Sequence, residues 1–305
     1  MNKFSIHIIL KILTGILVFF TLVFFKNYYS FLFSSTTSGL MALPENSNYL
    51  LIGSSLTRQS YDPSILRSKL GKVYLLAYNG NQPCMMSEQL RFLKKRGKTW
   101  NHLVLEFYPQ TSSQGPSISD LRIMLDSDLD LKRRYLALLS NEREISFSEY
   151  YELIVTSNIE LITTYFLTGA LIDSFSVDGG YVNKREEGSS EERLAAESEK
   201  IRIVSPKIHS AQLQCWKDLI EENQTEGKTL EVWEAPKFFS VSSDPNYREI
   251  KATFSRFLSE KGILFRSFTF SDRDPLLFRD PIHLSTQGRE VLSKTIIEAI
   301  EKAPN

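Results

Sequence analysis

The chain has 305 residues, 42% of them hydrophobic, which is enough for one large α/β domain or two smaller domains. Its 36 basic and 36 acidic residues give no net charge, so no overall field attracts nucleic acid and we expect no nucleic-acid partner. Two cysteines, Cys84 and Cys215, are too few for a disulfide framework or a Cys-rich metal site, and we expect neither a metal nor another cofactor. The two could pair in an oxidising compartment or stay as buried free thiols.

Residues 4–25 are almost entirely apolar, with His7 and Lys11 as the strongly polar exceptions. A run of about 20 such residues can span a bilayer. Lys3 and Lys11 on its amino side favour a cytoplasmic amino terminus, which puts the rest of the chain outside. We therefore predict a single-pass membrane anchor over residues 1–33, with the folded part on the periplasmic or extracellular side. The alternatives are a cleaved signal peptide, for which no small-residue cleavage site follows promptly, and a buried core helix.

After the anchor, residues 34–48 are rich in Ser, Thr and Gly and are predicted to form a linker. Strands and helices then alternate, which predicts a doubly wound, flavodoxin-like parallel sheet sandwiched by helices, in one domain over residues 49–305. The predicted strands cover residues 49–52, 73–78, 102–108, 230–233 and 263–270. One predicted helix starts at residue 62, and the others cover residues 85–95, 206–222, 247–261 and 285–302.

The alternation is interrupted by an insertion at about residues 112–205. Residues 121–143 are predicted to be helical, and residues 150–175 are mostly apolar. A second transmembrane segment is excluded there, because polar and acidic side chains within it would enter lipid unpaired. We expect a helical insertion that caps the sheet by packing on it, lines a substrate groove or lies on the membrane surface. Residues 176–200 have mixed charge and are predicted to be a solvated loop.

The first predicted strand ends in the turn Gly53-Ser54-Ser55, which precedes a helix. The two serines therefore lie at the carboxyl end of a strand, where open α/β sheets bind their ligands. A serine in such a turn can be a nucleophile, because its hydroxyl is exposed and adjacent backbone N–H groups can stabilise an oxyanion. By itself the stretch is more often a plain strand-to-helix turn.

Asp280 and His283 come directly before the last predicted helix. A serine nucleophile needs a base, and an imidazole base needs an acceptor that fixes its tautomer. The other histidines are less well placed, since His7 is in the anchor, His102 is at the amino end of a strand and His209 begins a surface helix. An Asp-x-x-His before a helix is by itself more often an N-terminal cap. Together with the serine turn it predicts a Ser-His-Asp arrangement.

These stretches resemble the SGNH, or GDSL-like, hydrolase superfamily. Gly53-Ser54-Ser55-Leu56 is similar to its first block, with Ser54 in place of the usual aspartate, and Asp280-Pro281-Ile282-His283 is similar to its last block. The resemblance implies that Ser55 is the nucleophile, His283 the base and Asp280 the partner of that base. It covers the sheet portion, residues 48–110 and 201–302.

The blocks that supply the oxyanion hole depart from the family pattern. The glycine of the second block corresponds to the middle residue of Asn79-Gly80-Asn81. The third block, Gly-x-Asn-Asp, is replaced by Tyr108-Pro109-Gln110, so the usual asparagine donor is absent. By resemblance, Asn79, Asn81 or Gln110 would donate a side-chain N–H instead, or the backbone N–H groups of Ser55 and Gly80 would act alone. Loss of one donor typically costs about 100- to 1,000-fold in rate.

The predicted anchor, the Gly-Ser-Ser block and the altered third block are similar to bacterial envelope members of the superfamily. The resemblance implies a membrane-anchored serine esterase or O-acyltransferase that acts through an acyl-enzyme. Its substrate would be an acylated small molecule, cell-envelope polymer or polysaccharide, and a membrane-bound acyl-donor protein is a candidate partner. The alternative is a catalytically weak or inactive relative that serves as a scaffold or binding component of an envelope-modifying complex. A phosphate-binding domain ranks third, because the glycine-rich loop and lysine of such sites are missing.

Overall fold

Five parallel strands form the centre of the folded part, in the order β2-β1-β3-β4-β5. They are β1 (Asn46–Gly53), β2 (Val73–Ala77), β3 (Thr99–Glu106), β4 (Thr229–Glu234) and β5 (Leu264–Ser267). This is the strand order of doubly wound, flavodoxin-like sheets, which bind ligands at their carboxyl edge beside the first strand. The predicted α/β class and parallel sheet are confirmed. The computed structural model describes residues 8–19, 21–22, 40, 43–118, 123, 127–147, 150, 186–201, 203, 205–224, 228–270 and 274–302.

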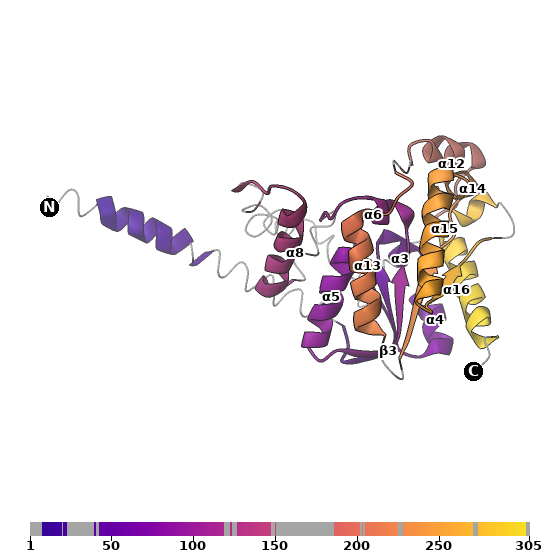
Figure 1. The fold of residues 1–305 in the computed structure, drawn as a ribbon, viewed down its shortest axis with the longest axis horizontal. Coiled ribbons are helices and arrows are strands. Elements are labelled where there is room, and N and C mark those ends of the chain that lie inside the picture. The colour runs from indigo at the N-terminus through magenta and orange to yellow at the C-terminus, as the bar shows by residue number, and fades with distance from the viewer. Residues whose placement is uncertain are drawn as a thin grey trace.

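Helices connect the strands and cover both faces of the sheet (Figure 1). Several begin at residues that the sequence marks as caps, since Asp62, Asp244 and Ser285 each accept a backbone N–H of the first turn that follows. The helices are α3 (Ser55–Ser60), α4 (Pro63–Leu70), α5 (Pro83–Lys95), α6 (Pro109–Ser113), α8 (Leu129–Glu142), α12 (Glu191–Ser198), α13 (Ser210–Asn223), α14 (Phe239–Ser242), α15 (Pro245–Glu260), the 3-10 helix η2 (Pro275–Leu277) and α16 (Thr286–Glu301).

Alternate residues of each strand face opposite sides of the sheet and fill two hydrophobic cores. On β1, Leu50 and Ile52 belong to the core beneath α5, α13 and α15, and Leu51 belongs to the core beneath α4 and α16. Helix α8 joins the first core through the fully buried Leu131 and Tyr135. With both faces of the sheet packed, the carboxyl ends of the strands give fixed positions for the side chains that follow them.

A disulfide joins Cys84, in the first turn of α5, to Cys215 on α13, with the two Cα atoms 4.9 Å apart. The sequence leaves the paired and the free-thiol states open, and the structure contains the pair. The bond crosses a sequence separation of 131 residues, which includes the whole predicted insertion.

Three elements differ from the sequence prediction. Strand β1 begins at Asn46, inside the predicted linker, and Ser47 is buried. The short helix α3 is not predicted, because six residues are too few to show a helical period. The prediction of a solvated loop over residues 176–200 is wrong for its described part: α12 buries Leu194 completely, and the backbone N–H of Ser189 donates to Phe278 O at 2.8 Å. The polar composition of this stretch gives no sign of these buried contacts.

The predicted insertion contains α8 and α12 in its described part. The apolar stretch 150–175 lies outside the described residues, apart from Tyr150. In the predicted anchor, residues 8–19 and 21–22 are helical. Among the helices that the structure describes, none is long and apolar enough to cross a membrane. The anchor, the linker and the domain boundaries stay predictions.

Candidate active site

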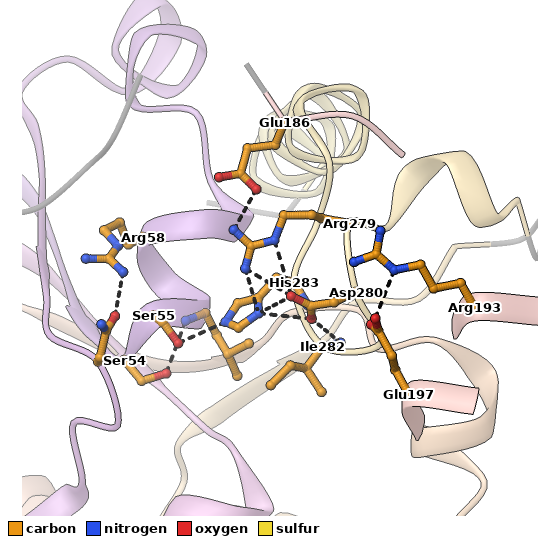
Figure 2. Close-up of polar contacts among 12 residues, drawn as sticks. Ser54, Ser55, Arg58, Glu186, Arg193, Glu197, Arg279, Asp280, Ile282 and His283 are labelled. Atoms are coloured by element: carbon orange, nitrogen blue, oxygen red, sulfur yellow. Dashed lines mark hydrogen bonds and ion pairs between the residues drawn. The ribbon is translucent and has the colours of Figure 1, made fainter. Parts of the chain in front are cut away.

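The turn between β1 and α3 presents Ser55. Ser54 caps α3, because its Oγ accepts the Leu56 N–H at 3.2 Å, and Ser55 is the first residue of the helix. A Cβ on Gly53 would lie 2.5 Å from Glu106 Cβ and 2.6 Å from one oxygen of its carboxylate. Only glycine therefore fits at the end of β1. The half-buried Ser55 points its hydroxyl toward His283 (Figure 2).

Glu106, the last residue of β3, holds this turn in place. Its buried carboxylate accepts the Ser54 N–H at 3.1 Å, the Ser54 hydroxyl at 2.5 Å and the Thr57 N–H at 2.5 Å, and the Thr57 hydroxyl donates to it as well. Hydrogen bonds to a charged acceptor are stronger than neutral ones. Because the residues on both sides of Ser55 donate to one carboxylate, the position of Ser55 is fixed from β3.

Asp280 and His283 lie in the loop between η2 and α16. Asp280 Oδ1 accepts the backbone N–H groups of Ile282 at 3.1 Å and His283 at 3.0 Å, which folds the loop tightly around the carboxylate. The loop is docked on the segment that follows β4, where the Phe238 N–H donates to Pro281 O at 2.9 Å. The alternative interpretation, that Asp280 caps the helix, is wrong, because the N-cap of α16 is Ser285.

Ser55, His283 and Asp280 form a continuous chain of polar contacts across a separation of 228 residues (Figure 2). Ser55 Oγ is 2.9 Å from His283 Nε2, and His283 Nδ1 is 3.0 and 2.9 Å from the two oxygens of Asp280. A carboxylate can only accept, so the ring proton is on Nδ1 and Nε2 accepts the Ser55 hydroxyl. This is the tautomer that a general base for Ser55 requires.

Arg279 extends this chain of contacts. Its Nη2 and Nε donate to Asp280 Oδ2 at 3.0 and 3.2 Å, and its Nη1 donates to Glu186 Oε2 at 2.6 Å. Burial acts to raise the pKa of the Asp280 carboxyl, but the hydrogen bonds and charges of His283 and then Arg279 outweigh burial and hold that pKa well below its usual value. Asp280 therefore stays a charged acceptor for the imidazole.

Two predicted oxyanion donors are not directed at the serine. Asn81 is buried, and its amide N–H groups donate to Gly53 O at 3.2 Å and Gln89 Oε1 at 2.9 Å. The Asn81 side chain therefore supports the end of β1 instead of an oxyanion. Gln110 accepts the Tyr108 hydroxyl at 2.8 Å, and within the described part of the chain no contact joins Gln110 to the serine.

Asn79 and Gly80 form the turn after β2, which is tied to the serine turn because Arg58 of α3 donates to Asn79 Oδ1. Gly80 has a φ of 61°, a backbone conformation that favours glycine. Among the described residues, the backbone N–H groups of Ser55 and Gly80 donate to no protein acceptor. These two groups are thus the candidate donors for an oxyanion.

The remaining histidines lie away from this site, and His7 is outside the described residues. His102 is within β3 and stacks on Tyr49, with ring centroids 4.2 Å apart. His209 precedes α13, with its Nε2 3.8 Å from Glu142. In the part of the chain that the structure describes, no group of three or more His, Cys, Asp or Glu side chains is arranged to hold a metal ion.

Sequence reasoning did not find Glu106, Arg279 or Glu186. Glu106 left one signal, because it is an acid that ends an otherwise apolar strand at the carboxyl edge of the sheet. Arg279 and Glu186 left none, since an Arg beside an Asp and a Glu in a charged stretch are ordinary surface features.

The similarity of this chain to known proteins is distant. No protein-family model matches the sequence, and no curated protein matches it. One similar solved structure is described as that of "a putative platelet activating factor from Streptococcus pneumonia". The match has a TM-score of 0.32 and 12% sequence identity, and it covers 94% of this chain and 98% of the other. At these values the likeness assigns neither a family nor an activity.

Proposed function

We propose that this protein is a membrane-anchored serine esterase or O-acyltransferase of the SGNH-like type, acting on an acylated cell-envelope polymer or polysaccharide. The supporting observation is the 2.9 Å contact between Ser55 Oγ and His283 Nε2, with Asp280 behind the ring at 2.9 Å. Helix capping does not explain this contact, because Ser54 and Ser285 already cap the two helices concerned. A base aligned on a serine hydroxyl is the arrangement of a nucleophile.

In the proposed reaction, Ser55 Oγ attacks the acyl carbonyl carbon while its proton passes to His283 Nε2. Asp280 stabilises the imidazolium that forms, and the backbone N–H groups of Ser55 and Gly80 stabilise the oxyanion. When the bond to the leaving oxygen breaks, that oxygen takes the proton from Nε2 and the acyl group stays on Ser55. Water or a sugar hydroxyl then attacks the acyl-enzyme, and Ser55 regains its proton.

A fluorophosphonate probe on the full-length protein in detergent tests this proposal. The probe should form an adduct on Ser55, located by mass spectrometry. Ser55→Ala and His283→Ala should abolish the adduct, and heat-denatured protein is the control for nonspecific labelling. Ser54→Ala should still be labelled on Ser55, more slowly, because Ser54 only caps the helix and binds Glu106. An adduct on Ser54, or labelling of Ser55→Ala at the wild-type rate, would contradict the assignment.

We also propose that the folded part works outside the cytoplasm. The helical residues 8–19 and 21–22 expose their large apolar side chains, from 44% of the surface of Ile9 to 67% of that of Leu17. Such a surface is stabilised by lipid. The Cys84–Cys215 disulfide is typical of an oxidising compartment. There an acylated polysaccharide would be the substrate, and a membrane-bound acyl-donor protein a candidate partner.

A reporter fused after Asn305 tests this location. An alkaline phosphatase fusion should be active, because that enzyme needs an oxidising compartment, and the mature protein should retain residues 1–33. A mature amino terminus near residue 40 would contradict the anchor and leave export intact. If a reporter that works only in the cytoplasm were active at the same position, the result would contradict both the anchor and the export of the folded part.

The second candidate function is an inactive scaffold or binding component of an envelope-modifying complex. Its support is that two predicted side-chain donors do not serve the oxyanion site. The Asn81 amide donates to Gly53 and Gln89, and Gln110 makes no described contact with the serine. This function predicts that the probe labels Ser55 while acetyl esters and acetylated polysaccharide are turned over no faster by wild type than by Ser55→Ala.

A further inference from the structure

The guanidinium of Arg279 contacts both the candidate base and the partner of that base. Its Nη2 lies 3.0 Å from Asp280 Oδ2 and 3.3 Å from His283 Nδ1 (Figure 2). Nδ1 carries the proton that it donates to Asp280, so it has no lone pair for an N–H of Arg279. Arg279 therefore does not form a hydrogen bond with the ring, but it places a positive charge beside the imidazole.

A positive charge at this distance disfavours the imidazolium form of His283. The same guanidinium also shares the negative charge of Asp280, which weakens the pull of Asp280 on a ring proton. Both effects act in one direction. Only a neutral imidazole can accept the Ser55 proton, so a cation at this position favours the form of His283 that can act as a base.

Glu186 holds Arg279 in this position. The Glu186 carboxylate accepts Arg279 Nη1 at 2.6 Å, and the two side chains are only 17% and 33% exposed. The backbone of Glu186 is itself fixed, because its N–H donates to Thr286 Oγ1 at 2.7 Å and its carbonyl accepts the Thr286 N–H at 2.9 Å. Two residues later, a Cβ on Gly188 would overlap the backbone of Leu276. This segment of the insertion thus contacts both ends of the loop that carries Asp280 and His283.

We propose that Arg279 is a positioning residue for His283, held in place by Glu186 of the insertion. Arg279 disfavours the imidazolium form of His283 and keeps the ring aligned on Ser55. This inference rests on the proposed function in one respect, that His283 is the base for Ser55. It adds that the insertion reaches the candidate base through one ion pair.

Other titratable groups face the same loop and stay unchanged in the test. Lys237, which follows β4, and Tyr108, which follows β3, both interact electrostatically with Asp280. The carboxylate of Glu106, at the end of β3, acts to raise the pKa of both groups. Because these groups are common to wild type and variants, a difference in the titration of His283 reports Arg279.

The test measures the titration of His283 and the labelling of Ser55 separately. Full-length protein in detergent, with ¹³C-labelled histidine, has four histidine signals, and His283→Ala identifies one of them. In Arg279→Met the titration midpoint of His283 should move up by about one pH unit. The acid limb of the fluorophosphonate labelling rate should move by the same amount. Arg279→Lys keeps the charge and should restore most of the wild-type profile.

Arg193→Met is the matched control. Arg193 forms an exposed pair with Glu197 on α12 at 2.9 Å, near the site but without contact to His283 (Figure 2). It should leave both midpoints in place. Glu186→Gln, the second variant, leaves the guanidinium charge but loosens it, and should lower the labelling rate on the alkaline plateau by about threefold or more.

The outcomes separate this inference from the proposed function. An unmoved His283 midpoint in a folded Arg279→Met overturns the role of Arg279, even if Ser55 is labelled normally. A shifted midpoint in a protein whose wild type is never labelled leaves the role of Arg279 in place and overturns the proposed function. An equal shift in Arg193→Met would mean that general surface charge is responsible, which also overturns the inference.

Discussion

Ser55 and His283 share one hydrogen bond and are expected to act as one unit. Either alanine substitution removes the same activated nucleophile, so each should lower kcat/KM for an acyl ester by about 10⁴-fold or more, and the double variant should be scarcely worse. Steady-state rates of the three variants check this. Losses that multiply in the double variant would show two independent contributions and contradict a shared role.

Lys237 is a buried ammonium near the candidate site. Its Nζ donates to Ala235 O at 2.9 Å and lies 5.5 Å from the centroid of the Tyr108 ring. Burial lowers the pKa of Lys237 to about 8 from its ordinary 10.5, against the carboxylates of Glu234 and Glu106, which act to raise it. Between these two values the unfolded chain holds a proton that the folded chain has lost. Lys237 therefore makes the free energy of unfolding rise with pH over that range.

Lys237→Met should remove this rise. The free energy of unfolding of the variant, minus that of wild type, should fall by up to about 3 kcal/mol between pH 7 and pH 10. Urea unfolding at several pH values measures the difference, and Lys294→Met, at an exposed pair with Glu290 on α16, serves as the control. A difference that is constant with pH would mean that Lys237 keeps its proton in the folded protein.

Ser55, Asp280 and His283 could be predicted from the sequence because each has a local signature, a serine turn after a strand or an Asp-x-x-His before a helix. Glu106 and Arg279 could not be assigned roles, because those roles depend on partners that are distant in sequence. Glu106 binds Thr57 across 49 residues, and Arg279 binds Glu186 across 93 residues. The same limitation applies to Asn81. Its amide could be predicted to be a hydrogen-bond donor, but the sequence could not show that Gly53 O is the acceptor.

At the level of the element, the junction of β1 and α3 tolerates no added side-chain atom. Gly53→Ala would place its Cβ 2.5 Å from Glu106 Cβ, so β3 or the serine turn must shift. We expect a loss of about 2–4 kcal/mol in the free energy of unfolding and a loss of probe labelling at Ser55. Gly53 is not among the described glycines with a positive φ, so the expected loss comes from this close contact and not from backbone strain. Wild-type labelling of a stable Gly53→Ala would contradict this tight junction.

The strands and long helices could be predicted because buried parallel strands are short apolar runs and the helices carry caps at their first turns. The short elements could not. Helix α3 has six residues and α12 buries Leu194 in a polar stretch, so neither gives a period that the sequence can reveal. Both short helices flank the candidate site, which is why its immediate surroundings were the least predictable part of the fold.

Across the whole molecule, the insertion is connected to the candidate site at two places. It leaves the sheet through α6, which starts three residues beyond Glu106, and its residue Glu186 binds Arg279. The insertion is also not a separate layer, since α8 buries Leu131 and Tyr135 in the core of the sheet. Replacing residues 112–205 by a short linker should therefore impair folding as well as substrate choice.

The Cys84–Cys215 bond has a consequence for proteolysis, because every residue of the insertion lies between the two half-cystines. A protease that cuts the backbone once anywhere in that stretch leaves two fragments that remain covalently joined. The nicked chain should migrate as one species on a denaturing gel without reductant and as two species with it. Cys215→Ser, cut in the same way, should separate under both conditions. A protein built in this way can be cut in its insertion without losing either half of its sheet.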